Sequence, residues 1–225
     1  DTDQRIWGRT AIDVTLTADA GGVFEVDFTG LAVWAVTVDG YQTPFDYRNG
    51  RLSVAAEEGA RTVEIRYLGS PDDGLIIGEN VHGDATVFAD NWPNRARFWF
   101  PSVDDPSDKA TIRFTVHAPT QWEVIANGSL QSDPYRTPPD ALTQLGYVGT
   151  IEHRTWTWAS KVDIPAYTMV VGAADFAIQS FGEAACGKAP EAPNGCVEVS
   201  AWVFPQDSTT AVRQFARSAQ MVDYF

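Results

Sequence analysis

Short segments in which apolar and polar residues alternate dominate the first two-thirds of the chain. Ile12, Val14 and Leu16 occupy every second position of "IDVTL", and "FEVDF" repeats the pattern. Because successive side chains of a strand point to opposite faces, this period predicts strands with one face in the core and the other in water. Asp-Gly and Asn-Gly pairs between these segments indicate hairpin turns. The pattern predicts an all-β chain, an antiparallel sandwich or barrel.

The same alternation assigns side chains to faces in individual segments. In "WAVTV", Trp34, Val36 and Val38 are expected on one face. In "TVEIRY", Val63, Ile65 and Tyr67 are expected to share the core face. Each of these sets is therefore a prediction of core residues.

The pattern changes in the last segment, residues 205–225. Asp207 and Ser208 have the chemistry of a helix N-cap. Val212, Phe215 and Met221 then recur at helical spacing, which predicts an amphipathic C-terminal helix. Such a helix can pack back on the β domain, or it can begin a second domain. The pattern leaves both open.

Length and charge exclude several classes of protein. The chain has 225 residues, enough for one large β domain or one domain and the start of another. The formal net charge is −14, which argues against binding nucleic acid, because phosphates require a basic surface. No run approaches the roughly 18–20 apolar residues that span a bilayer, so no membrane span is expected.

The two cysteines, Cys186 and Cys196, flank a loop rich in Pro, Gly and Ala. A disulfide is favoured over two free thiols, and it implies an exported protein, periplasmic or extracellular. A metal site is less favoured, because neither His nor further Cys lies nearby to complete the ligands. The first ten residues lack the features of a signal peptide, which does not exclude one removed earlier.

Catalytic patterns are scarce. The three histidines, His82, His117 and His153, are not spaced as in a zinc helix, and no nucleophile elbow or phosphate loop is present. His117 is expected to be an ordinary surface residue. His82, between turns, is the one of interest, although a structural role is favoured for it as well. We therefore expect no catalytic residue and no metal ligand set in this chain.

The most specific motif lies in "FADNWPNRARFWFPSVDDPSDKA", residues 88–110. It follows the spacing A-R-x-x-F-P-x-x-D-x-P-x-x-K-A, with Ala96, Arg97, Phe100, Pro101, Asp104, Pro106, Lys109 and Ala110 at the matched positions. This spacing resembles the N-terminal domain of the aminopeptidase N family of zinc metallopeptidases. Further similarity follows in the same order, at Asn127-Gly128, Tyr167, Gly172 and Phe176.

The resemblance implies a saddle-like antiparallel β-sandwich over residues 1–204. Residues 205–225 would then be the first helix of a catalytic metallopeptidase domain. In the family, the zinc-binding H-E-x-x-H helix and the substrate-binding G-x-M-E-N strand follow that point. The resemblance thus implies zinc as cofactor of the parent enzyme, with the catalytic domain of the same polypeptide and a peptide substrate as partners. The chain by itself is expected to bind no zinc and to hydrolyse nothing.

The resemblance also implies a substrate-binding segment, Asp90, Asn91 and Trp92. In many relatives the loop before the Ala-Arg pair carries a polar residue that binds the free amino terminus of the substrate. Trp92 stands at that position here, a departure from the family pattern. Asp90 is expected to offer a carboxylate to an ammonium group, and Trp92 an apolar wall or a cation–π face. Core packing of Trp92 is the alternative.

The remaining motif residues are expected to be structural. Pro101 and Pro106 fix backbone φ angles in the segment where, in the family, this domain meets the catalytic domain. Arg97 is expected to pair with Asp104, and Lys109 with Asp105 or Asp108.

The main alternative function is a stand-alone β-sandwich module that binds carbohydrate or protein. It predicts that Val212, Phe215 and Met221 are buried against the sandwich, whereas the aminopeptidase interpretation predicts that part of this apolar face is bare. A third interpretation is a non-catalytic scaffold that retains the peptidase-like domain.

Overall fold

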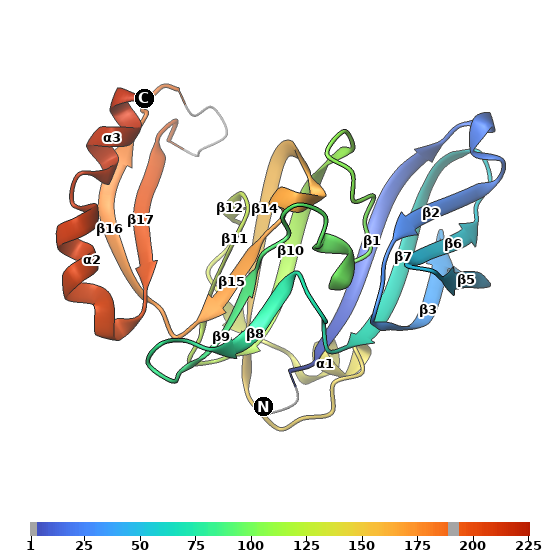
Figure 1. Ribbon diagram of the computed structural model, residues 1–225, viewed down its shortest axis with the longest axis horizontal. Helices are drawn as coiled ribbons and strands as arrows, with labels where there is room; N and C mark the ends of the chain where they lie inside the picture. The colour runs from blue at the N-terminus through green and yellow to red at the C-terminus, as the bar shows by residue number, and fades with distance from the viewer. Residues whose placement is uncertain (1–3, 189–193) are drawn as a thin grey trace.

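The computed structural model describes residues 4–188 and 194–225. Every strand pairing in this part of the chain is antiparallel, so the prediction of an all-β antiparallel fold with a helical C-terminus is confirmed. Three groups of strands lie side by side, each formed largely by consecutive chain (Figure 1). No helix in the described residues is long and apolar enough to cross a membrane.

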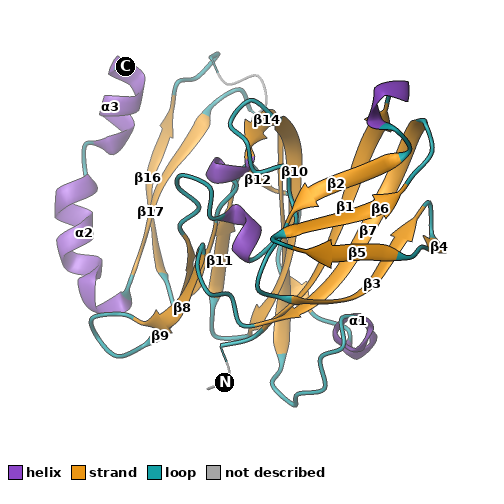
Figure 2. Cartoon of the chain, turned by 45° about the vertical axis from the view of Figure 1, so that its right-hand side comes forward, coloured by secondary structure: helices purple, strands orange, loops and turns teal. Residues whose placement is uncertain are grey.

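The first group holds two sheets in face-to-face layers (Figure 2). One sheet has the order β1 (Ile6–Leu16), β7 (Gly59–Gly69), β3 (Ala32–Val38), β4 (Tyr41–Gln42). The other has the order β2 (Val23–Asp27), β6 (Arg51–Ala55), β5 (Phe45–Arg48), and the short turn η1 (Ala18–Ala20) precedes β2. The ring of Phe28 packs edge-on against Tyr67 at 4.9 Å between centroids, which joins the layers.

The second group forms the centre of the molecule. One sheet has the order β10 (Lys109–Pro119), β14 (His153–Pro165), β12 (Ser129–Leu130), with β13 (Tyr135–Arg136) also paired to β14. The other has the order β11 (Glu123–Ala126), β15 (Val171–Ala174), β9 (Ala85–Ala89), β8 (Leu75–Glu79). Connecting segments contain η2 (Ala96–Phe98), α1 (Pro139–Gln144) and η3 (Ala166–Thr168). Trp158 donates its indole N–H to the Val124 carbonyl at 3.0 Å and so ties one sheet to the other.

The third group is the hairpin β16 (Ala177–Ala184) and β17 (Val197–Val203), followed by η4 (Pro205–Asp207), α2 (Ser208–Phe215) and α3 (Ser218–Tyr224). Both helices pack on this hairpin. The predicted single helix is therefore two, with a break at Ala216 and Arg217, where Arg217 has φ −104° and ψ 5°. No residue of that break is a glycine or a proline.

The alternating pattern predicted most core faces. Val63, Ile65 and Tyr67 are buried in one hydrophobic core that continues into the central sheets. The prediction for Trp34 is wrong, because a bulge between Val33 and Ala35 changes the register of β3 against β7. Trp34 is exposed and lies 5.5 Å from the guanidinium of Arg66, while Val36 is fully buried.

Candidate functional site

The motif segment forms the connection between β9 and β10, which we call the corner (residues 90–108). Its first residue continues the β8–β9 pairing, because the Asp90 N–H donates to the Gly74 carbonyl at 2.8 Å. The Trp92–Pro93 peptide bond is cis. The chain then turns through η2 and runs back into β10.

Asn91 faces inward. Its side chain is 1% exposed, and its amide donates to the carbonyls of Ala166 and Met169 at 3.2 and 2.6 Å. Its carbonyl oxygen accepts the indole N–H of Trp99 at 2.7 Å. Since a buried amide with all these bonds has nothing left for a ligand, we correct the expectation that Asn91 contacts substrate. It positions the corner against η3 instead.

Its two neighbours face outward. Trp92 is 62% exposed, and its indole meets the ring of Tyr167 edge-on at 5.2 Å between centroids. The core-packing alternative for Trp92 is therefore wrong. Asp90 is about half exposed and lies beside it in sequence. The two residues offer a carboxylate and an aromatic surface to the solvent.

Arg95 forms an ion pair with Asp90. Its guanidinium lies 2.6 Å from the Asp90 carboxylate and 3.2 Å from that of Asp73, and its Nε donates to the Trp92 carbonyl at 2.6 Å. Partial desolvation lowers the pKa of Arg95, but its hydrogen bonds and charge pairing with Asp90 and Asp73 outweigh this and raise it. An ammonium group that approaches Asp90 would therefore compete with Arg95.

Gly74 makes this arrangement possible. It has φ +73°, a conformation that side-chain-bearing residues rarely adopt. A Cβ at this position would lie 2.0 Å from the Arg95 carbonyl oxygen. Only glycine lets β8 and the corner approach this closely.

A second network holds the far half of the corner. The predicted Arg97–Asp104 pair is present, with Nε donating to Oδ2 at 3.0 Å. The guanidinium also reaches Asp27 at the end of β2, at 3.3 Å, and the Asp104 N–H donates to Asp27 at 3.2 Å. The side chain of Asp104 is buried. Asp27 is the member that sequence analysis missed, because it lies 70 residues from Arg97.

The partners of these motif residues lie within this chain. Arg97 and Asp104 join the corner to β2 of this same chain, and the Asp27–Ser102 backbone pairing continues that junction. The network is therefore an internal joint between the first and second groups of strands. A shallow groove of about 330 Å³ lies beside it, lined by Glu25, Val26, Asp27, Arg51, Arg97, Val103, Asp104 and Asp105.

The other motif residues divide into buried and exposed members. Pro101 is fully buried, whereas Pro106 and Lys109 are exposed. Within the described residues no ion pair joins Lys109 to Asp105 or Asp108, so that predicted pairing is wrong. Asp105 is satisfied locally instead, by the hydroxyl and the N–H of Ser107 at 2.6 and 2.8 Å, which lower its pKa.

His117 differs from its prediction as a surface residue. It is partly buried, and its Nδ1 forms a hydrogen bond with the Thr155 hydroxyl at 2.9 Å. Burial lowers the pKa of His117, and the nearby positive charges of His153 and Arg9 lower it further. His82 lies elsewhere, 3.0 Å from Asp207.

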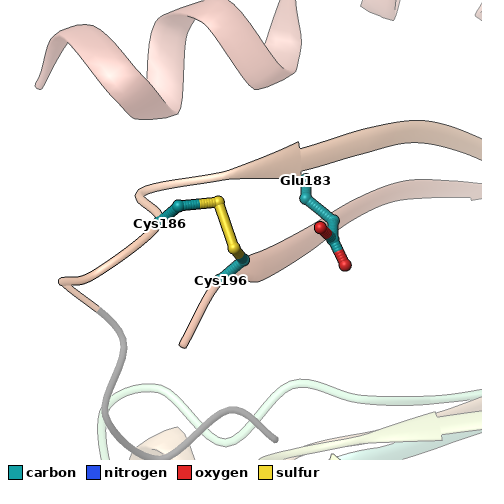
Figure 3. Close-up of side chains that lie close together, drawn as sticks. All are labelled: Glu183, Cys186 and Cys196. Atoms are coloured by element: carbon teal, nitrogen blue, oxygen red, sulfur yellow. A yellow bond between two sulfur atoms is a disulfide. The ribbon is translucent and has the colours of Figure 1, made fainter. Parts of the chain in front are cut away.

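The described residues do not fit a zinc site. Their one group of three closely spaced potential metal ligands is Glu183, Cys186 and Cys196 (Figure 3). The two cysteine sulfurs are joined in a disulfide, so neither is a thiolate that could bind a metal. Glu183 accepts a hydrogen bond from Asn194 at the same end of the hairpin. Residues 189–193 of the intervening loop lie outside the described part of the chain.

Comparison with known proteins identifies the fold. No family model matches the chain. A probable aminopeptidase 1 of Sulfurisphaera tokodaii is 30% identical over 110 residues, 48% of this chain and 14% of the relative. A mutant M1 zinc metallopeptidase of Deinococcus radiodurans superimposes with a TM-score of 0.69 and 18% identity, over 90% of this chain and 44% of that one. Yeast LTA4 hydrolase gives a TM-score of 0.72 and 19% identity, over 96% and 31%.

The chain has the fold of an M1 zinc metallopeptidase domain. The resemblance seen in the corner motif is thereby confirmed. The chain spans less than half the length of each of these relatives.

Proposed function

We propose that this chain is the non-catalytic N-terminal domain of a zinc aminopeptidase, forming one wall of the active-site cleft. The observation that carries the proposal is the unequal coverage: M1 zinc metallopeptidases and LTA4 hydrolase match 85–96% of this chain but only 31–48% of their own length. The remainder of such a polypeptide would hold the zinc and remove residues from the peptide amino terminus. The domain described here would supply no ligand to the metal.

The proposed division places the domain at residues 1–204 and the start of the catalytic domain at 205–225. It is supported by the apolar face of α2 and α3. Val212, Phe215 and Met221 are 42%, 45% and 59% exposed. The stand-alone module required these side chains to be buried against the sandwich, so their exposure favours a covering catalytic domain.

At the cleft, Asp90 and Trp92 would contribute to the rim that receives the substrate amino terminus. The Asp90 carboxylate would attract the ammonium group in partial exchange for Arg95, and Trp92 would lie along an apolar side chain or the cation itself. Both side chains are exposed, two residues apart in the corner. The buried hydrogen bond between Trp99 and Asn91 would stabilise the conformation of the corner.

Export is part of the proposal, to the periplasm or the extracellular space. It is supported by the Cys186–Cys196 disulfide, because such bonds persist in oxidising compartments.

A direct experiment tests whether this chain is non-catalytic by itself. The chain is incubated with Zn²⁺ and a panel of aminoacyl anilides, and release of the aniline is followed with and without a chelator. We expect no turnover. Turnover that co-purifies with the chain and is abolished by the chelator would overturn the proposal, and saturable glycan binding by titration would support the stand-alone module instead.

The rim is tested in the full-length polypeptide. Asp90→Asn and Trp92→Ala are expected to raise KM for aminoacyl anilides with a smaller effect on kcat, because both residues would bind rather than react. Tyr41→Ala, another exposed aromatic remote from the corner in sequence, is the matched control. Unchanged KM in both rim variants would remove Asp90 and Trp92 from the site.

A further inference from the structure

The helices α2 and α3 belong to a unit that stands apart from the central sheets. We call β16, β17, η4, α2 and α3 the C-terminal unit (residues 177–224). Figure 1 shows it on one side of the molecule, with the helices on the outer face of the hairpin. The chain enters the unit through Asp175 and Phe176, between β15 and β16. Because β16 and β17 form a separate two-stranded sheet, side-chain contacts contribute to the orientation of the unit.

An aromatic cluster makes the apolar part of this junction. Phe176 and Phe204 flank the open end of the hairpin, next to the Ala177–Val203 pair, and stack at 6.1 Å between centroids. Phe88 of β9 meets both rings edge-on, at 5.9 and 6.5 Å. Trp202 of β17 adds edge-on contacts to Phe176 at 6.1 Å and to Trp158 of β14 at 6.2 Å. These ring contacts favour association, and edge-on contacts tolerate some rotation.

Two polar contacts add direction to this junction, and both come from the turn between β8 and β9. His82 Nε2 lies 3.0 Å from the Asp207 carboxylate of η4. Two residues further along the turn, Asp84 accepts the side-chain amide of Gln206 at 2.9 Å. The turn thus holds two consecutive residues at the point where α2 begins.

The turn itself is rigid. The side-chain oxygen of Asn80 accepts the N–H groups of His82 and Asp84 at 2.8 and 3.0 Å, and the Asn80 N–H donates to the Asp84 carbonyl at 2.8 Å. Gly83 adopts φ +86°, which closes the turn. His82 and Asp84 are therefore presented in fixed positions to the C-terminal unit.

We propose that the β8–β9 turn is a latch for the C-terminal unit, closed by the His82–Asp207 and Asp84–Gln206 contacts and tightened when His82 is protonated. Two carboxylates lie at this contact, Asp207 from η4 and Asp84 from the turn itself, while Phe204 places the edge of an apolar ring beside the imidazole. An imidazolium there would form a charge-assisted bond to Asp207 in place of a neutral one. We therefore expect the latch to hold η4 more firmly at about pH 6 than at about pH 8.

The latch does not depend on the proposed function, because all its contacts lie within this chain. Under the proposed function it has a further consequence, since α2 would lead into the catalytic domain and the latch would set the angle between the two domains.

Limited proteolysis of the whole chain measures the latch. Arg213 and Arg217 are exposed trypsin sites in α2 and at the break before α3, and cleavage there requires local opening. Cleavage rates at these sites are followed by mass spectrometry, and each variant is compared with the unmodified chain at the same pH, so that the pH dependence of trypsin cancels. His82→Gln is expected to raise the rate about twofold to fivefold at pH 6, as for a partly exposed charge pair, and less at pH 8.

Two variants make the result specific. His153→Gln is the control, because the His153 side chain contacts the Ile151 carbonyl and the Tyr147 ring, both outside the C-terminal unit. The cleavage rates of this variant should equal those of the unmodified chain. In a chain that carries Asp207→Asn, His82→Gln should change the cleavage rate by the same factor at pH 6 and at pH 8. The cleavage rate of the double variant, His82→Gln with Asp207→Asn, should be no more pH-dependent than that of His82→Gln alone. An unchanged urea midpoint for His82→Gln assigns the effect to local opening. Equal rates for His82→Gln and the unmodified chain at pH 6, or a rate ratio that does not fall at pH 8, would overturn the proposal.

Discussion

The corner and the C-terminal unit differ in the side chains that they bury and expose. In the corner, Asn91, Arg97 and Asp104 are polar, largely buried and bonded to named partners within the chain. In the C-terminal unit, Phe215 and Met221 are apolar and largely exposed. A segment whose buried charged and amide groups are paired within the chain has its conformation set by its own fold. A segment with a bare apolar face has a surface that a neighbouring body would stabilise.

The largest expected effect comes from the ion network of the corner. Arg97→Ala leaves the buried carboxylate of Asp104 without its partner, which should cost about 3–5 kcal/mol of unfolding free energy. Urea unfolding at neutral pH measures the loss. Arg97→Lys keeps the charge but not the forked geometry, so it should recover only part of the stability. An alanine variant within about 0.5 kcal/mol of the unmodified chain would show that the corner is not held by this network.

Asn91→Ala should destabilise the chain by about 2–3 kcal/mol, because the Trp99 indole and two carbonyls lose their partner in the interior. The adjacent Trp92→Ala is the matched control. It removes mainly exposed surface and one ring contact, so at most about 1 kcal/mol is expected. Similar losses in the two variants would contradict the assignment of Asn91 to the interior and Trp92 to the surface.

A pH effect is expected at His117. Its folded-state pKa is lowered, so the unfolded chain binds a proton more readily than the folded one. The free energy of unfolding should therefore be constant above about pH 6.5, the unfolded value, and decrease as the pH falls below it toward the folded pKa. Urea titrations between pH 8 and pH 5 measure this slope, and His117→Gln should flatten it. An equally steep slope in that variant would assign the titration to another group.

The smallest effect on stability is expected in the C-terminal unit. Met221→Gln changes a side chain that is mostly exposed, so the free energy of unfolding should stay within about 0.5 kcal/mol. The same variant should reduce binding of a hydrophobic dye to the isolated chain, since it removes part of the bare face. A loss above about 2 kcal/mol would mean that the face is packed internally and that the contrast with the corner does not hold.

Local pattern predicted much of the fold and less of the site. Alternation within a few residues was sufficient for the core faces of β1 and β7, because strand geometry alone decides which way those side chains point. The bulge that exposes Trp34 depends on pairing with β7, about thirty residues away, and leaves no local signal.

The corner shows the same limit. The Arg97–Asp104 pair is close in sequence and was predicted, whereas Asp27, which completes it, is distant and was missed. Asn91 and Trp92 are neighbours of similar apparent interest. The Asn91 amide is buried against the backbone carbonyls of Ala166 and Met169, whereas the Trp92 indole meets the edge of Tyr167 and stays 62% exposed. Which of two adjacent residues faces a ligand is a property of the packing around them.

The conformation of the corner depends on Gly74, a residue outside the corner itself. It bears no charge and would contact no substrate, yet any larger residue there would drive the Arg95 carbonyl aside and separate Arg95 from both Asp73 and Asp90. In a survey of random variants, replacement of Gly74 should be tolerated as poorly as replacement of Arg95, Asp73 or Asp90. This should hold even for alanine, which is normally the mildest substitution.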